Sequence, residues 1–293
     1  MASQSIDRPV IFIVGPTASG KTNLTISLAK KFNGEIICAD SRTIYRKMDI
    51  GTAKPTIEEQ NQVKHWGIDI CDVGDRFTAA DFQKYAKEKI ASIQKRGMVP
   101  FVVGGSGLYI DSLLYDYSFA GGYDQKKRQI LETQTVEELQ KYCLNNNIKL
   151  PNNSKNRRYI IRAIEKNGNR TDKKTVQDNY VVVGISTNRD VLIDRITKRA
   201  EQIFSNGIVD EAKMLGDIYG WSSEAMTANI YHIVQDYLRD EITYDEAIAN
   251  CILDDLHLAK KQITWFKRNK HIRWYSLDGA ETYISRLLSL HNQ

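Results

Sequence analysis

The sequence has few of the features that mark membrane, secreted and metal-cluster proteins. No stretch of its 293 residues approaches the roughly 18 consecutive apolar residues of a membrane helix. The opening segment, MASQSIDRP, has neither the basic start nor the apolar centre of a secretion signal. The four cysteines are scattered and form no CxxC pair, which argues against a zinc site and a disulfide framework. We therefore expect a cytoplasmic protein without a membrane partner.

The positive charge is small but unevenly distributed. The net charge is +5, yet residues 155–174 carry eight Lys or Arg against two acidic residues. Residues 259–274 carry six Lys or Arg, no acidic residue, and three aromatic side chains. One basic run alone is often only a solvated helix face. Two such runs, one of them with interleaved aromatics, favour a polyanionic partner such as a nucleic acid.

Short, nearly apolar segments alternate with helical patterns in the first part of the chain. Four of these segments have the composition of strands buried on both faces, and a fifth near the C-terminus is more polar. The expected strands are 9–14, 35–39, 99–103, 180–185 and 271–276. Helices are expected at 21–32, 79–95, 189–204, 209–219, 227–239 and 244–268. The alternation predicts an α/β fold: a three-layer core with a parallel sheet, like that of P-loop NTPases, and a mostly helical C-terminal half.

The segment 116–151 interrupts this pattern. It is polar and contains one clear helical stretch, expected at about 125–145. We interpret it as a small helical insertion lobe, with 1–115 and 152–293 forming the P-loop core and its helical elements.

The strongest motif is IFIVGPTASGKT at residues 11–22. The pattern G-x-x-x-x-G-K-[ST], between an expected strand and an expected helix, predicts a phosphate-binding loop. Gly15 and Gly20 allow several backbone N–H groups to face one anion at the positive end of the helix. Lys21 would contact an outer phosphate, and the hydroxyl of Thr22 would bind Mg²⁺.

A phosphate loop does not by itself separate an ATP-binding NTPase from a kinase or from an enzyme that holds a diphosphate leaving group. The segment 99–103 runs into GGSGLY, without the acidic residue of a Walker B strand. The segment 35–39 instead leads directly to Asp40. This carboxylate could ligate Mg²⁺, act as a general base, or only cap the next segment.

Several longer motifs resemble the tRNA dimethylallyltransferase (IPP transferase) family. They occur in the family's order and cover most of the chain, and the second and fourth of them are much more specific than a phosphate loop. The motifs are GPTASGKT (15–22), ADSRTIYRKMDIGTAKPT (39–56), HWGIDICDVGDRFTAADF (65–82), VVGGSGLYIDSLL (102–114), NRRYIIRAIE (156–165) and AKKQITWFKR (259–268).

The resemblance implies that the phosphate is a leaving group. The loop would bind the diphosphate of dimethylallyl diphosphate, and the prenyl group would pass to the exocyclic amine of the adenosine 3′ of the anticodon. The residues expected to bind diphosphate are Gly15, Pro16, Thr17, Ala18, Ser19, Gly20, Lys21 and Thr22. Asp40 would accept the proton of the amine. Thr17 matches a family threonine at the reacting end, although shaping the loop is an equally good explanation for it.

The resemblance also implies a surface for the anticodon stem-loop. Its expected contacts are Asp40, Ser41, Arg42, Thr43, Ser106, Arg128, Arg158 and Arg162. For the last three, an ordinary surface arginine is the alternative. Trp265 and Phe266 are expected in the core under the final helix. We expect a monomer.

The chain departs from the family pattern at four positions. Ile230 and His232 flank a tyrosine where the family has GYR, Leu256 replaces an arginine, and Tyr159 stands where an arginine is common. His232, Lys260 or Lys261 are candidates to supply the missing charge. Two other functions therefore stay open: a paralogue that binds tRNA with little or no transfer, and a kinase or prenyltransferase acting on free adenine nucleotides.

Overall fold

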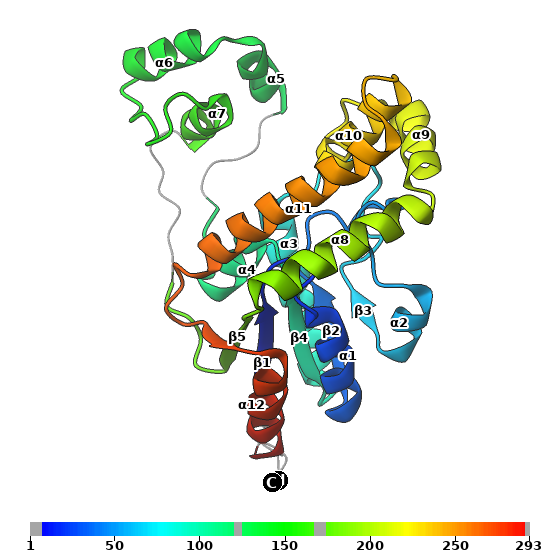
Figure 1. Ribbon diagram of the computed structural model, residues 1–293. Coiled ribbons are helices and arrows are strands. Elements are labelled where there is room, and N and C mark those ends of the chain that lie inside the picture. Colours follow the sequence, from blue (N-terminus) through cyan, green and yellow to red (C-terminus); the bar gives the residue numbers. More distant parts are fainter. Residues whose placement is uncertain (1–7, 120–124, 167–173, 291–293) are drawn as a thin grey trace. The chain divides into compact units, whose positions relative to one another are not determined.

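The computed structural model describes residues 8–119, 125–166 and 174–290 and divides the chain into two compact units. The first unit comprises the chain up to Leu114 and from Val176 onward, and the second comprises Tyr115–Thr175. Figure 1 shows the elements of both. No helix in the described part of the chain is long and apolar enough to cross a bilayer.

The first unit is built on one parallel sheet with the strand order β3-β2-β4-β1-β5-β6. Its strands are β1 (Val10–Val14), β2 (Gly34–Cys38), β3 (His65–Trp66), β4 (Val99–Gly104), β5 (Tyr180–Ile185) and β6 (Arg273–Tyr275). Every residue of β1, β2 and β4 is buried, as their apolar sequences predict. The five expected strands are confirmed to within two residues at either end, and only the two-residue β3 was not expected.

Helices cover both faces of this sheet and so make three layers. Those near the sheet are α1 (Lys21–Lys31), α2 (Ile57–Gln62), α3 (Ala79–Lys95), α4 (Gly107–Leu114) and α12 (Leu277–Leu290). Leu28 of α1 and Ile284 of α12 pack in one core cluster with the strands, whereas α3 and α4 pack together elsewhere, where Phe82 stacks on Tyr109. The three-layer α/β fold is confirmed.

The C-terminal helices form a second core of the first unit. They are α8 (Arg189–Ser205), α9 (Ile208–Tyr219), the 3₁₀ turn η1 (Ala225–Thr227), α10 (Asn229–Leu238) and α11 (Tyr244–Phe266). Their apolar faces enclose Ile44 and Met48, which belong to the segment after β2. The segment after β2 (residues 39–56) is thus held in place by helical residues that lie more than 150 positions later in the sequence.

The second unit is helical but larger than the expected lobe of residues 116–151. It contains α5 (Gln125–Thr133), α6 (Val136–Asn145) and α7 (Arg157–Lys166). Ile160 and Ile164 of α7 pack against Leu131 and Leu139, so α7 belongs to this unit rather than to the core. The single helix expected at 125–145 is two, because Thr135 caps a new helix with its side chain.

Candidate active site

The phosphate loop (residues 15–22), Asp40 and the GGSG segment (residues 104–107) meet at the carboxyl ends of three strands of the sheet. They follow β1, β2 and β4, and these three strands are neighbours because β4 pairs with both β1 and β2. The carboxyl ends of parallel strands lie on the same edge, which is where open α/β sheets bind their ligands. Sequence order alone does not show this adjacency, since β4 inserts between two earlier strands.

The phosphate loop has the strained backbone that its glycines and small residues allow. Gly20 precedes α1 with a φ of 84°, and Ala18 has a φ of 58°. This positive φ is the reason for glycine at position 20, since L side chains rarely adopt it. Lys21 Nζ donates a hydrogen bond of 2.7 Å to the carbonyl oxygen of Pro16 and is thereby folded over the loop.

The surroundings of Lys21 destabilise its charged form. Burial lowers its pKa from 10.5 to about 8; Asp40 opposes that shift, and Arg199 adds to it. Two cations thus lie close enough to destabilise each other. An anion bound between them would relieve this repulsion, as a polyphosphate site requires.

Two side chains from distant helices hold Thr17. Arg199 of α8 donates a hydrogen bond of 2.5 Å from Nη1 to Thr17 Oγ1, and Gln262 Oε1 of α11 accepts one of 2.8 Å from the Thr17 amide. Arg199 Nε is buried without a hydrogen-bond partner among the described residues and lies 4.0 Å from Asp255 Oδ2. Arg199 therefore connects the phosphate loop with Asp255 of α11.

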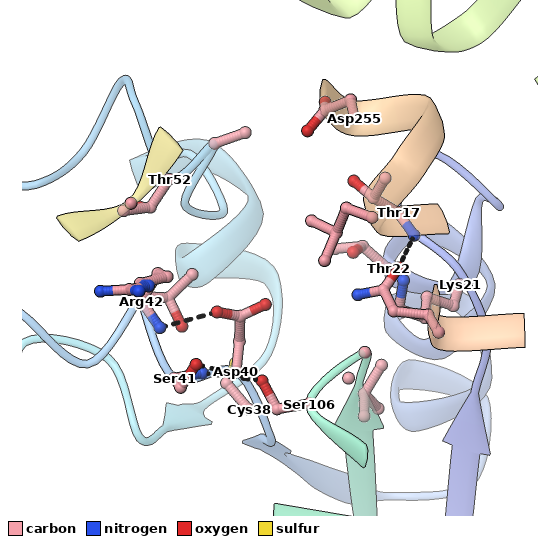
Figure 2. Close-up of a pocket in the computed structure, with 18 of the residues that line it drawn as sticks. Thr17, Lys21, Thr22, Cys38, Asp40, Ser41, Arg42, Thr52, Ser106 and Asp255 are labelled. Atoms are coloured by element: carbon pink, nitrogen blue, oxygen red, sulfur yellow. Dashed lines mark hydrogen bonds between the residues drawn. The ribbon is translucent and has the colours of Figure 1, made fainter. Parts of the chain in front are cut away.

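Asp40 lies on the other side of the same cavity (Figure 2). Its Oδ1 accepts a hydrogen bond of 2.8 Å from the amide of Arg42, so the carboxylate does cap the turn that follows it. Ser106 Oγ accepts a bond of 3.0 Å from the Ser41 amide and fixes the next residue as well. Capping uses only Oδ1 of Asp40, so the same side chain can cap the turn and also serve the cavity through its other oxygen.

Glycines permit this close assembly. A Cβ at Gly104 would lie 2.0 Å from the carbonyl oxygen of Ala39, and one at Gly105 would lie 2.3 Å from Gln262 Nε2. The GGSG segment thus needs glycine for contact with the segment before Asp40 and with α11. Packing alone thus explains these two glycines.

The three segments enclose a cavity of about 600 Å³. It is lined by the phosphate loop, the segment after β2, the GGSG segment and parts of α10 and α11. Among its lining residues are Thr17, Lys21, Thr22, Asp40, Ser41, Arg42, Thr43, Thr52, Ser106, Arg199, Asp255 and Gln262. Cys38 and Val103 also line it, so the cavity combines charged and apolar surface, as a charged ligand with a short hydrocarbon part would need.

The other expected tRNA contacts lie in the second unit. Arg128 forms ion pairs with Glu132 and Glu165, and Arg162 pairs with the same buried Glu165 at 3.1 Å. Arg128 therefore links α5 to α7, whereas the pair of Arg162 with Glu165 lies within α7. Arg158, on the same helix as Arg162, has an exposed side chain. Part of the basic run, residues 167–173, lies outside the described residues.

The departures from the family pattern occupy different environments. Ile230 lines the cavity, whereas His232 is exposed and does not. Leu256 packs against the cluster of Leu192 and Ile196 and contributes no charge. Tyr159 is 58% exposed on the second unit.

Two expectations need correction. None of His232, Lys260 and Lys261 lines the cavity, and Arg199 is the cation there, besides Lys21 and Arg42, that was not expected. Phe266 is fully buried as expected, but Trp265 is 38% exposed. Trp265 lines the cavity and donates a hydrogen bond of 2.9 Å from Nε1 to Asp111, because the face of α11 on which it lies crosses Gly107.

Comparison with known proteins identifies the family. The model of the family described as IPP transferase matches residues 43–269. The chain belongs to the IPP transferase family. A tRNA dimethylallyltransferase of Pediococcus pentosaceus is 40% identical over 286 residues, which cover 92% of this chain and 91% of that protein. A relative of the same name from Halalkalibacterium halodurans is 34% identical over 303 residues and covers 97% and 95%.

Solved structures of the family agree in fold. A full-length tRNA isopentenylpyrophosphate transferase from Bacillus halodurans superposes with a TM-score of 0.74 at 35% identity, covering 97% of this chain and 98% of that one. A homologous transferase from Staphylococcus epidermidis gives a TM-score of 0.72 at 31% identity, covering 96% and 99%. Both superpositions cover nearly the whole chain and therefore include the elements that line the cavity.

Arg199 and Gln262 belong to the site but were not among the residues expected there. Arg199 lies on an ordinary amphipathic helix, and nothing in its local sequence distinguishes it from its exposed neighbour Lys198. Gln262 lies within the quoted motif AKKQITWFKR, and the motif was the only signal for it in the sequence.

Proposed function

We propose that this protein transfers a dimethylallyl group from dimethylallyl diphosphate to the exocyclic amine of the adenosine 3′ of the anticodon in tRNA. The observation that carries the proposal is the cavity lined by Lys21, Arg199 and Thr17 together with Asp40. Kinship with tRNA dimethylallyltransferases over more than nine-tenths of the chain supports it.

The phosphate loop would stabilise the leaving group. When the carbon–oxygen bond breaks, its electron pair stays on the diphosphate, and the anionic charge grows there. Lys21, Arg199 and the loop amides are fixed around the place where this charge develops, so they bind the transition state better than the substrate. Thr17 accepts a hydrogen bond from Arg199 and follows Pro16, whose carbonyl Lys21 contacts, so its hydroxyl would lie beside the leaving group.

Asp40 would act on the incoming nucleophile. The exocyclic amine is a weak nucleophile because its lone pair is delocalised into the adenine ring. While nitrogen forms its bond to the prenyl carbon, one of its protons would pass to a carboxylate oxygen of Asp40. The hydrogen bond from the Arg42 amide keeps that carboxylate oriented, so the base is positioned before the substrate enters.

The donor atoms of the site fit Mg²⁺ bound mainly through the diphosphate. The described residues contain no group of three or more His, Cys, Asp or Glu side chains that could hold a metal alone. The Thr22 hydroxyl and the Asp40 carboxylate line the same cavity, which is the sparse set of protein oxygens that Mg²⁺ uses beside phosphates. The ion would neutralise part of the diphosphate charge.

The adenosine would leave its stack to enter the cavity, which costs a few kcal/mol. Ser41, Arg42, Thr43 and Ser106 line the cavity beside Asp40, where an extruded nucleoside would lie. Arg128, Arg158 and Arg162 are the proposed contacts of the second unit with the RNA backbone. We further propose that the protein works as a cytoplasmic monomer.

The test combines the purified protein with Mg²⁺, dimethylallyl diphosphate and an anticodon stem-loop with adenosines after the anticodon. Mass spectrometry of the digested RNA should find one five-carbon group on the first of these adenosines. Substituting guanosine at that position should abolish the product. Retention of the RNA without product would favour the binding-only alternative, and prenylation of free AMP would favour the small-molecule one.

A further inference from the structure

A buried carboxylate holds the loop 49–53, which belongs to the motif DIGTAKPT. Glu211 of α9 is only 8% exposed, and its Oε2 accepts hydrogen bonds of 2.8 and 2.7 Å from the amides of Asp49 and Ile50. Its Oε1 accepts bonds of 2.9 Å from the amide of Gly51 and from the hydroxyl of Tyr231. One side chain thus binds three consecutive amides of a loop 160 residues away.

Tyr231 completes this arrangement from α10. It is fully buried, and burial together with the neighbouring Glu211 raises the pKa of its phenol far above the ordinary value of 10. The phenol is therefore always a donor. All four groups donate to the two carboxylate oxygens of Glu211, and an amide in place of the carboxylate would direct its own N–H₂ at two of them.

The loop needs this support because its conformation is strained and tightly packed. Ala53 has a φ of 44°, which L side chains rarely adopt. A Cβ at Gly51 would lie 2.8 Å from the Tyr231 hydroxyl and 2.8 Å from Ile208 Cδ1. A strained conformation persists only where surrounding contacts hold it. Here the hydrogen bonds of Glu211 and the packing of Tyr231 hold the loop.

The held loop forms part of the cavity wall. Gly51, Thr52 and Ala53 line the cavity, and Thr52 faces it from the side of Arg42, across from Asp255 (Figure 2). The phosphate loop is anchored separately, through Arg199 and Gln262. The two sides of the cavity therefore depend on different sets of contacts.

We infer that Glu211 and Tyr231 are positioning residues for the RNA substrate: they fix the wall against which the extruded adenosine docks and leave the diphosphate side unaffected. The inference rests on the proposed function, since it names the substrate served by one wall of the proposed site. Neither residue touches the reacting atoms. Their effect passes through the backbone of residues 49–53.

The experiment compares Tyr231→Phe and Glu211→Gln with the control Val234→Ala. The first removes a single hydroxyl, and the second is isosteric. Val234 is fully buried in the same helix and core cluster as Tyr231 but does not line the cavity, so its truncation measures the effect of a weakened core alone. The measurements are melting temperature, Kd for the anticodon stem-loop, Kd for inorganic diphosphate, and the KM values of both substrates.

Tyr231→Phe should raise the Kd and KM for RNA by about fivefold, and Glu211→Gln by about twentyfold or more, because a hydrogen bond to a charged group is lost or reversed. The Kd for diphosphate should stay within about twofold of wild type, since its anchors are untouched. Val234→Ala should lower the melting temperature without this split between the substrates.

The inference is overturned if RNA binding is unchanged in Glu211→Gln, or if RNA and diphosphate affinities fall together as they do in Val234→Ala. Failure of the proposed function would look different. Wild-type protein would then bind neither the stem-loop nor diphosphate, or would bind both and transfer nothing, before any variant is compared.

Discussion

Replacing Lys21 by methionine should make the protein more stable and inactive at once. Lys21 is the cation of the phosphate loop, and burial and Arg199 together hold its charged form in an unfavourable environment. Methionine keeps most of the side-chain volume and carries no charge. The substitution therefore separates the stability of the fold from the requirement of the site.

The magnitude follows from the pKa. Lowering it from 10.5 to about 8 makes the charged lysine less stable in the folded protein by about 3 kcal/mol, at about 1.4 kcal/mol per pH unit. The variant also loses the hydrogen bond from Nζ to the carbonyl of Pro16, worth about 1 kcal/mol. The free energy of unfolding should therefore rise by about 2 kcal/mol at pH 7.

The gain should depend on pH in a definite direction. Between pH 8 and 10.5 the unfolded wild-type chain still holds the Lys21 proton while the folded protein has released it, so wild-type stability gains from this residue as the pH rises. The advantage of the variant should shrink from about 2 kcal/mol at pH 7 to near zero at pH 9.5. Urea unfolding of both proteins at the two pH values, without diphosphate, measures it.

A variant less stable than wild type at pH 7, or an advantage that grows with pH, would show that Lys21 is not held charged against burial. The titration of Lys21 should also change the affinity for the ligand. The affinity of wild type for inorganic diphosphate should fall as the pH rises through about 8, and Lys21→Met should bind it poorly at every pH.

Three further substitutions test the remaining parts of the site. Asp40→Asn should lower kcat of prenyl transfer by about 10²- to 10⁴-fold while the Kd for the stem-loop stays near wild type, because only the proton acceptor is lost; near-normal kcat would refute the assignment. Arg199→Gln should raise the Kd for diphosphate about tenfold or more, whereas Lys198→Ala, an exposed neighbour on the same helix, should not. Gly104→Ala should lower the free energy of unfolding by about 3 kcal/mol, since its Cβ would meet the Ala39 carbonyl, and an unchanged melting temperature would contradict the packing described.

The sequence was sufficient where local chemistry decides the structure. The alternation of buried strands and helices predicts the parallel sheet, and the apolar periodicity of 79–95 predicts α3, which the structure begins at Ala79 behind the N-cap Thr78. The phosphate loop and Asp40 could be identified because each follows directly on an apolar strand.

The missing parts depend on tertiary contacts. Arg199 and Glu211 lie on helices whose patterns differ in no way from those of ordinary amphipathic helices, and both act on loops more than 150 residues earlier. Trp265 follows the apolar pattern of α11 and was expected in the core, but α11 crosses Gly107 and leaves the indole at the cavity. The extent of the second unit was underestimated because the apolar face of α7 fits either unit until its partners are known.

The most direct test of the central claim is a single-turnover reaction with radiolabelled dimethylallyl diphosphate, the anticodon stem-loop and Mg²⁺, in which label in RNA and release of diphosphate are followed together. The account predicts that the two appear at the same rate, one for one, in wild type, and that neither appears in Lys21→Met. Release of diphosphate without label in RNA, or hydrolysis of ATP as the faster reaction of this cavity, would contradict it.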